Sequence, residues 1–517
     1  MQILKFYFLL SFVAIKICVT TAYSAARNLY DDLFNKAHNY PKLLPVVNLE
    51  TPVIVYMNLS LSQILEVNVK DQIIVLNVWV YQEWNDNRFS WDPSDYGGLT
   101  EIQIPSSMIW LPDLVLYNNA GGDWDLSGMS GSKVKVKHDG TIIWKPPVIL
   151  KSQCEMDVTY FPFDIQTCPL KMGTWTHHGL LIDLRHWAQK VSDLSNERIK
   201  YDNCESKIDY AIDLTDYLQS YEWDLLSVTA NRNIKKYPCC PEPYLDVTFH
   251  IKIRRMTLFY GLNLIFPCLS ISFLTIMVFY LPTYSTQKIT LCISVFLALN
   301  IFILVVFDLT PSTSRSVPLI VKYLLFTMFM VTFSIVASIA VLNFSFRQPE
   351  TDKLSDNMKK IFLKTLPTYL KMRSVEFKEN SEIPTSFGST KSTNYADYSM
   401  YDLTWLKWNK GYTEMMNSKS GTAQNFSSAK RNLALESLRS IKYNLLLKTR
   451  RNEVRNEWMY MGIVIDRLFL IVFTVIVTLG SLIIFLMPPQ LWSQQLVLNS
   501  KDAAQMLANS NYTRLCK

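Results

Sequence analysis

The chain has 517 residues, of which 49% are hydrophobic and 18% are charged, and its formal net charge is +7. The apolar excess is concentrated in four long runs, which favours a membrane protein with a sizeable soluble part. The soluble part contains no Gly-rich phosphate loop and no HExxH or GxSxG pattern, which argues against an enzyme. We expect no cofactor, no metal and no nucleic-acid partner.

The first 22 residues predict a secretory signal peptide. Lys5 precedes an apolar run over 6–15, and small residues follow. Lys16 interrupts this pattern and leaves the cleavage site open. Export places the next part of the chain in an oxidising compartment, where cysteines can pair.

Residues 23–256 predict one extracellular β-sandwich. The segment 27–38 has the pattern of an amphipathic helix, and short alternating or aromatic-rich runs follow it, separated by Pro, Gly, Asn and Asp. About 230 residues of this kind suit a single sandwich. Asn58-Leu59-Ser60 predicts an N-glycosylation site at Asn58.

Cys154 and Cys168 enclose thirteen residues with the apolar centre Phe161-Pro162-Phe163-Asp164. If oxidised, they close a loop, here called the finger, and a ring of about fifteen residues contributes roughly 3 kcal/mol of stability. Pro162 between two aromatic residues is a candidate for a cis peptide bond. Two interpretations stay open: an internal staple of the sandwich, or a finger whose tip contacts another part of the protein.

Aromatic residues beside polar turns form the other signal in this region. They occur in Trp110-Leu111-Pro112-Asp113, in Gly173-Thr174-Trp175-Thr176 and in the run from Tyr237 to Tyr244. Each run alone is more typical of a core than of a ligand site. The run from Tyr237 also contains Cys239-Cys240, and because adjacent Cα atoms lie about 3.8 Å apart, below the usual disulfide span of about 4.4–6.8 Å, a bond between them would rigidify a sharp turn. The alternative is that one of them pairs with Cys204.

Four apolar runs predict membrane-spanning helices, since each has about 19 residues or more. They lie at 259–281, 289–307, 318–344 and 462–487. We therefore expect the first three helices within 257–346 and the fourth at 462–487.

The segment 347–461 between the third and fourth helices is predicted to be cytoplasmic. Residues 347–457 hold 20 Lys and Arg against 12 Asp and Glu, a net charge of +8 that leaves −1 for the remainder. Its part 349–427 is polar and predicted to be partly disordered. Its part 428–461 predicts a basic amphipathic helix that runs into the fourth span, or alternatively a membrane-surface helix or a solvated charged face.

The tail 488–517 is then extracellular, because an exported amino terminus and four crossings return the chain to the outside. Asn511-Tyr512-Thr513 predicts a second glycosylation site at Asn511. Cys516 either bridges to another protein or stays free.

The Cys154–Cys168 loop with its Phe161-Pro162-Phe163-Asp164 centre, the aromatic runs around Trp110 and Trp175 and the Cys239-Cys240 pair closely resemble the Cys-loop pentameric ligand-gated channels. The resemblance is specifically to nicotinic acetylcholine receptor subunits of α type. The resemblance also includes Arg254-Arg255-Met256-Thr257 before the first span and Asp466-Arg467-Leu468-Phe469 in the fourth. It covers nearly the whole chain and fails only in the signal segment, in 349–427 and in the tail. It implies a four-helix transmembrane domain after the sandwich, in a multi-pass protein of the plasma membrane and of synapses.

The resemblance implies a pentamer with an agonist site between neighbouring subunits. Acetylcholine or a related quaternary ammonium is the implied agonist, and an aromatic cage suits it because such a cation attracts electron-rich ring faces. The implied principal face consists of Tyr117, Trp175, Tyr237, Cys239, Cys240 and Tyr244, with disulfides Cys154–Cys168 and Cys239–Cys240. The complementary face of a neighbour would use the position of Trp79.

Two departures from the family bear on the assembly and the agonist. Lys135 and Lys145 occupy complementary-face positions that are often apolar in nicotinic receptors, and two ammonium groups there would repel a cationic ligand. We therefore expect this subunit to supply the principal face in a heteropentamer with other subunits. His177 and His178, where relatives carry an aromatic residue followed by Asp or Gly, leave the identity of the agonist open.

The second span predicts a pore-lining helix because its residues at spacings of three and four share one face. The predicted lining residues are Gln287, Thr290, Ser294, Leu297, Ile301, Val305 and Asp308. Cation-selective relatives carry Glu at the position of Gln287, and anion-selective relatives show a Pro-Ala insertion that is absent here. We expect a cation channel, with an anion-selective or other-amine-gated channel as the alternative.

Coupling is expected where the finger tip, Phe161 to Asp164, meets the linker 309–317. Arg255 ends the sandwich, and by comparison with relatives its acidic partner is expected to be Glu66 or Asp71. Two rivals stay open: a membrane-anchored recognition protein without a conduction pathway, and a subunit that assembles but binds no agonist.

Overall fold

The structure is a computed structural model. It describes residues 24–35, 42–46, 51–121, 131–192, 204–283, 285, 287–310, 315–347, 354–372, 423–492, 497–498 and 512–516. The chain divides into two compact units: Met1–Pro267 with Ile301–Leu324 and Leu482–Lys517, and Cys268–Asn300 with Leu325–Ser481. The predicted signal peptide, 1–22, lies outside the described residues.

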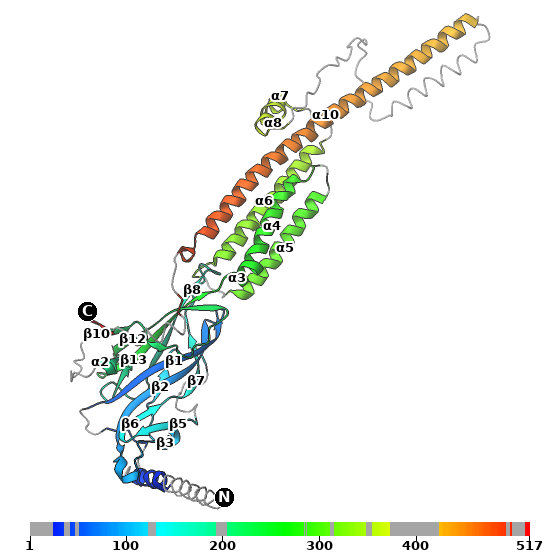
Figure 1. Cartoon of the computed structure of the whole chain (residues 1–517). Coiled ribbons are helices and arrows are strands. Elements are labelled where there is room, and N and C mark those ends of the chain that lie inside the picture. The colour runs from blue at the N-terminus through cyan, green and yellow to red at the C-terminus, as the bar shows by residue number, and fades with distance from the viewer. Residues whose placement is uncertain are drawn as a thin grey trace, which may run out of the picture. The chain divides into compact units, whose positions relative to one another are not determined.

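The amino-terminal part of the first unit is built from two β-sheets (Figure 1). The first sheet has the order β11 (Ile212–Asp213), β1 (Val53–Asn68), β2 (Ile73–Ser90), β6 (Asp139–Trp144), β5 (Lys133–Lys137), β3 (Glu101–Pro105), with β7 (Pro147–Gln153) on β2 and β9 (Ile182–His186) on β1. The second sheet has the order β14 (Tyr512–Cys516), β10 (Cys204–Ile208), β12 (Trp223–Lys236), β13 (Pro243–Arg255), β8 (Ile165–Thr174), β4 (Leu114–Leu116). Between these described strands, the pairings of β1 with β9 and with β11 are parallel and the others are antiparallel.

The alternating sequence pattern produces the core of these sheets. Along β7 every second residue is buried, as expected for a strand with one face inward. The largest side chains of the interior include Trp84, Trp144, Trp223 and Phe249, all fully buried. The expected extracellular sandwich fold is confirmed.

Short helices precede or connect the strands of these sheets. The expected amphipathic helix at 27–38 is found at 24–35, and Leu29 and Leu33, four residues apart, are its buried positions. The others are η1 (Pro93–Tyr96), η2 (Ser106–Met108) and α2 (Ala188–Ser192).

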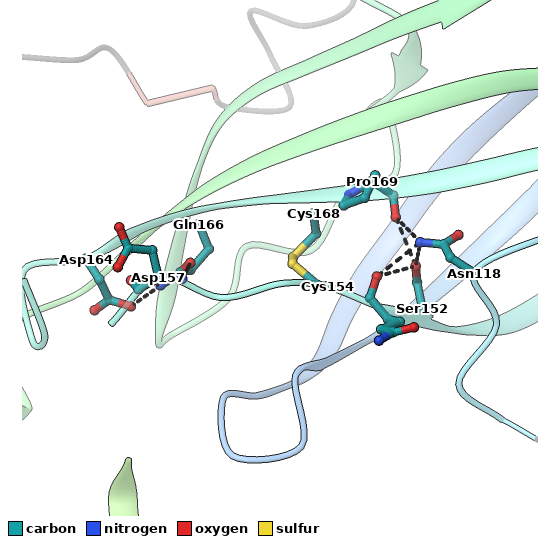
Figure 2. Close-up of a disulfide and its surroundings, with 9 residues drawn as sticks. Asn118, Ser152, Cys154, Asp157, Asp164, Gln166, Cys168 and Pro169 are labelled. Carbon is teal, nitrogen blue, oxygen red and sulfur yellow. Dashed lines mark hydrogen bonds between the residues drawn. A yellow bond between two sulfur atoms is a disulfide. The ribbon is translucent and has the colours of Figure 1, made fainter. Parts of the chain in front are cut away.

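The finger is closed by a Cys154–Cys168 disulfide (Figure 2), as predicted. The bond Phe161–Pro162 is cis. Beside the disulfide, the Asn118 side-chain amide donates to Ser152 Oγ and to the Pro169 carbonyl, each at 2.8 Å. These polar contacts join β7 and β8 directly beside the two cysteines, so the base of the finger is held by hydrogen bonds as well as by the covalent bond.

Within the part of the chain that the structure describes, four helices are long and apolar enough to cross a membrane, as predicted. The first span is formed by α3 (Leu258–Tyr260), η3 (Gly261–Ile265), α4 (Phe266–Met277) and η4 (Val278–Tyr280). The second is α5 (Gln287–Leu309), the third is α6 (Leu319–Ser345), and the fourth is part of α10 (Ala423–Leu486). In the second unit, Phe279, Ala337 and Phe473 form a buried cluster that packs three of these spans together.

The predicted amphipathic segment 428–461 is helical and continuous with the fourth span in α10 (Figure 1). Shorter helices in the described part of the intervening segment are α7 (Asp356–Lys359), η5 (Lys360–Thr365) and α8 (Leu366–Tyr369), and η6 (Pro489–Leu491) follows α10. Leu354 packs with Trp458 and Met461 in a buried cluster. Most of 349–427, predicted to be partly disordered, lies outside the described residues.

Candidate functional site

Four aromatic side chains gather at one end of the second sheet. Tyr117 follows β4, Trp175 follows β8, Tyr237 follows β12, and Tyr244 belongs to β13. The strand registers bring the ends of β12, β13 and β8 together, because Lys235 lies opposite Tyr244 and Asp246 lies opposite Gly173. The Tyr117 backbone lies beside Lys171, and its side chain reaches the end of β8, where the hydroxyl meets the Thr174 carbonyl. β13 also pairs with β8, so the four residues come from neighbouring strands.

The rings form two pairs that are open to solvent. The centroids of Tyr117 and Trp175 lie 6.2 Å apart, and those of Tyr237 and Tyr244 lie 5.7 Å apart. Trp175 is 60% exposed and Tyr237 is 43% exposed. A purely structural role for Trp175 would bury it in the sandwich, so its exposure beside Tyr117 favours a ligand site.

Asp113 holds the turn that carries Trp175. The Trp175 amide donates to the Asp113 carbonyl at 3.2 Å, and the Thr176 amide donates to Asp113 Oδ2 at 2.6 Å. His177 Nδ1 lies 3.0 Å from Asp113 Oδ1. The sequence showed Asp113 in a family motif, but its role as an anchor becomes visible only in the structure.

A charged pair lies beneath Tyr117. Lys171 Nζ lies 5.2 Å from the Tyr117 ring centroid and 3.7 Å from Asp246 Oδ1. Burial, together with the Asp246 carboxylate, raises the pKa of Tyr117 above its ordinary value. The phenol therefore stays neutral and donates to the Thr174 carbonyl at 2.6 Å.

Sequence reasoning missed Lys171 and Asp246. Neither residue stands in a distinctive motif, and only the pairing of β8 with β13 brings them together. Asp246 Oδ2 also accepts from the Asn233 amide at 2.8 Å and from the Thr248 hydroxyl at 2.9 Å. The carboxylate is thus held in one position.

Cys239 and Cys240 lie in the turn between β12 and β13. They are free thiols in the structure, with their sulfur atoms 2.6 Å apart. The turn is closed by the Cys240 amide, which donates to the Tyr237 carbonyl at 3.2 Å. The predicted bond between these cysteines stays a prediction.

The predicted complementary-face residues lie on the first sheet. Trp79 in β2 is 41% exposed. Lys135 Nζ lies 3.1 Å from a Glu101 carboxylate oxygen, and Lys145 Nζ lies 4.9 Å from the Tyr81 ring centroid. Both ammonium groups thus have partners within the chain, so the repulsion expected of Lys135 is reduced by Glu101.

One face of α5 is exposed and carries all the predicted pore-lining residues. These residues are Gln287, Thr290, Ser294, Leu297, Ile301, Val305 and Asp308. Lys288, Cys292, Val295 and Leu299 on the other side are buried. Because bulky apolar side chains such as Ile301 lie open in the single chain, this face is suited to a lumen or to contact with other subunits.

Lys288, at the start of α5, is turned away from the exposed face. Its Nζ lies 2.5 Å from Asp466 Oδ1 on α10, and the side-chain exposures are 0% and 6%. The positive charge beside Gln287 is therefore neutralised within the chain.

The finger tip is largely buried within the chain. Phe161 packs edge-on against Tyr260, with centroids 5.4 Å apart. Asp164 accepts from Arg255, with Nε to Oδ1 at 2.8 Å and Nη2 to Oδ2 at 3.2 Å. A described contact between the finger and the segment after α5 is an ion pair between Glu155 and Arg315.

The prediction that Glu66 or Asp71 is the acidic partner of Arg255 was wrong. Asp164 and Glu222, rather than Glu66 or Asp71, accept from its guanidinium. The physical reason is that Asp164 lies at the buried tip of the finger and presents both oxygens to the guanidinium.

The remaining predicted sites are partly covered by the structure. Asn58 lies within β1, where its side-chain oxygen accepts from the Leu59 amide at 2.9 Å, and its glycosylation stays a prediction. Asn511 lies outside the described residues. Among the described residues, no group of three or more His, Cys, Asp or Glu side chains could hold a metal ion.

Family models match most of the chain. The neurotransmitter-gated ion-channel ligand binding domain matches residues 26–257, and the neurotransmitter-gated ion-channel transmembrane region matches residues 264–485. The first match covers the strands from β1 to β13, and the second covers the second and third spans with most of the first and fourth.

Proteins similar to this chain are named as acetylcholine receptor subunits. Acetylcholine receptor subunit alpha-L1 of Schistocerca gregaria is 49% identical over 352 residues, which is 68% of this chain and only 60% of that relative's length. Acetylcholine receptor subunit alpha-type unc-63 of Caenorhabditis elegans is 39% identical over 485 residues, 92% of this chain and 95% of that protein. Neuronal acetylcholine receptor subunit alpha-3 of Homo sapiens is 37% identical over 499 residues, 91% of this chain and 93% of that protein.

Proposed function

Since the chain belongs to the neurotransmitter-gated ion-channel family, among its acetylcholine receptor subunits, we propose that it supplies the principal agonist-binding face of an acetylcholine-gated cation channel. The observation that carries this proposal is the exposed Trp175 beside Tyr117, with the Tyr237–Tyr244 pair at the same end of the sheet. The protein would be a multi-pass subunit of the plasma membrane, at synapses, within a heteropentamer.

The chemistry of the site suits a quaternary ammonium. Such a cation has no proton to donate, so it is bound by ring faces, each worth about 0.5–2 kcal/mol. Lys171 places a positive charge near Tyr117, but its contact with Asp246 compensates that charge. The turn with Cys239 and Cys240 would close over the bound agonist.

The exposed face of α5 would line the conduction pathway in a pentamer. Five copies of Leu297 and Ile301 would form apolar rings, and such constrictions can close by dewetting. Asp308 would supply a carboxylate ring at one end. Gln287 is neutral and Lys288 is paired with Asp466, so partner subunits would supply the inner carboxylates.

Coupling would pass through the finger. Its tip packs against Arg255, which ends β13, and against Tyr260, which lies in α3 at the start of the first span. Glu155 pairs with Arg315 in the segment after α5. An agonist that binds better to the open arrangement would shift the population towards it. These contacts give the shift a physical route from the sheet to the pore helix.

Voltage-clamp recording tests the agonist site. Trp175→Ala, expressed with partner subunits, is expected to raise the half-maximal acetylcholine concentration about 30-fold or more, corresponding to the loss of about 2 kcal/mol. The matched control is Trp187→Ala, which removes another exposed tryptophan, just after β9 on the first sheet. An unchanged acetylcholine response in Trp175→Ala, with normal surface abundance, would contradict the assignment.

The same recordings test assembly and selectivity. We expect little current from this chain alone and robust current with partner subunits, because Lys135 and Lys145 disfavour the complementary role. Large currents from the chain alone would refute the heteropentamer. A reversal potential that follows chloride rather than sodium would support the anion-selective alternative.

A further inference from the structure

We propose that Cys204 and Cys516 form a disulfide that ties the carboxyl-terminal tail to the second sheet. β14 pairs with β10 in antiparallel register over five residue pairs, and Cys204 lies directly opposite Cys516. The two cysteines, 312 positions apart in the sequence, thus occupy one rung of the sheet.

The strand geometry permits the bond. Directly opposite residues in an antiparallel pair have Cα atoms about 4.5 Å or about 5.5 Å apart, depending on the type of rung. Disulfides join Cα atoms about 4.4–6.8 Å apart. Either type of rung therefore lies within the range that a disulfide can span without moving the backbone.

The other cysteines of the chain have separate places. The chain contains nine cysteines, and Cys18 falls in the predicted signal peptide. Cys154 and Cys168 are bonded to each other, Cys268 and Cys292 are buried in the membrane-spanning helices, and the Cys239 and Cys240 sulfurs adjoin each other. Cys204 and Cys516 are the two that remain.

The strand register disfavours a bond between Cys204 and the Cys239–Cys240 turn. Ser206 lies opposite Arg232, so the same register continued by two residues places Cys204 beside Ile234. Cys239 is five residues further along the chain, roughly 16 Å for an extended strand. Cys516 already lies directly opposite Cys204, so a bond between them needs no displacement of the backbone.

A second contact returns the tail to the same sheet. The Leu498 amide donates to the Leu225 carbonyl at 2.9 Å, and the Leu498 side chain is buried. Leu225 belongs to β12, the strand that pairs with β10. The tail therefore meets this sheet at two separate positions.

The bond would form by thiol–disulfide exchange with a disulfide-bearing oxidoreductase of the secretory compartment. The thiolate of one cysteine attacks a sulfur of the donor disulfide and forms a mixed disulfide. The thiolate of the other then displaces the donor, which leaves as a dithiol with both electrons. The net change is two protein thiols oxidised to one disulfide and one donor disulfide reduced to two thiols.

The bond would restrain the sheet that carries the agonist site. β10 lies between β14 and β12, and β12 leads directly to Tyr237. The functional consequence rests on the proposed function, but the bond itself does not.

Cleavage of the full chain within the cytoplasmic segment tests the bond directly. A site for a specific protease is introduced within 373–421, the receptor is expressed at the cell surface with partner subunits, thiols are blocked with N-ethylmaleimide, and the protein is cleaved. Cys516 is the only cysteine after Cys292, so any covalent link between the two fragments must use it. We expect the fragments to run together on a non-reducing denaturing gel and to separate after reduction.

Variants and peptide mapping identify the partner. The fragments of Cys516→Ser and of Cys204→Ser are expected to separate without reductant, and non-reducing mass spectrometry of the unmutated protein is expected to find one peptide pair joined through Cys204 and Cys516. Separation of the unmutated fragments, a link that survives in Cys204→Ser, or a Cys516-dependent dimer of whole chains would overturn the proposal. The gel does not depend on agonist binding, so a failure here leaves the agonist-site assignment untouched.

Discussion

The buried pair between Arg255 and Asp164 yields a stability prediction with an internal control. The side chains are 2% and 1% exposed, and two hydrogen bonds join them. The guanidinium also lies 4.2 Å from the Trp223 ring centroid. Arg255→Ala leaves the Asp164 carboxylate buried without its cation, which costs about 3–5 kcal/mol.

The neighbouring Arg254 provides the matched control. Arg254 Nη2 lies 2.9 Å from Asp224 Oδ2, but the side chains are 28% and 17% exposed. Solvent screens such a pair, and Arg254→Ala is expected to cost about 0–1 kcal/mol. The two substitutions remove the same side chain from adjacent positions of β13, so their difference measures what the buried environment of Arg255, including its ring contacts, adds to an ion pair.

The assay is the thermal unfolding midpoint of the solubilised full-length receptor, followed by size-exclusion chromatography, together with surface abundance. For a domain of this size, we expect Arg255→Ala to lower the midpoint by roughly 6–20 °C and Arg254→Ala by at most about 4 °C. Equal effects of the two variants would refute the reasoning that burial of the Arg255 pair decides its contribution.

Three further predictions concern single side chains. Burial lowers the pKa of His186 from 6.5 to about 4, so between these pH values the unfolded chain binds a proton that the folded chain excludes. The free energy of unfolding should therefore fall by about 3 kcal/mol as the pH drops from 6.5 to 4, and a thermal unfolding midpoint that drops equally in His186→Gln would contradict this. A Cβ on Gly173 would lie 2.6 Å from Tyr117 Oη, so Gly173→Ala should displace the ring and weaken the acetylcholine response at normal surface abundance; an unaltered dose–response curve would show that the ring position is unimportant. Asp466→Asn removes the negative charge that pairs with the buried Lys288 and should lower the stability of the fold by about 3–5 kcal/mol. The expected readout is a loss of surface expression that Lys288→Met restores, and normal expression of Asp466→Asn alone would argue against a pair shielded from water.

The sequence predicted the parts of the structure that follow from pattern. Alternation predicted the sandwich, and apolar length predicted the four spans, because both depend on local composition alone. The face of α5 followed from helical spacing: the residues placed together there, such as Leu297 and Ile301, are exposed together. The aromatic residues of the candidate site followed from family motifs rather than from periodicity.

The contacts that depend on strand register could not be predicted. Lys171 and Asp246 sit in ordinary strand patterns, and only the pairing of β8 with β13 brings them beneath Tyr117. The partner of Arg255 was assigned wrongly because alignment with relatives gives no information on which carboxylate is buried beside it. The same limit hid the rung of Cys204 and Cys516, whose partners are far apart in the chain.

The central claim is that electron-rich rings of this subunit bind a cationic transmitter. The most direct test replaces Trp175 with tryptophans that carry one, two or three fluorine atoms, which withdraw electron density from the ring face while nearly preserving its shape. The cation–π account predicts that the half-maximal acetylcholine concentration rises with each fluorine. A response that is independent of fluorination would contradict the account, because Trp175 would then contribute shape alone.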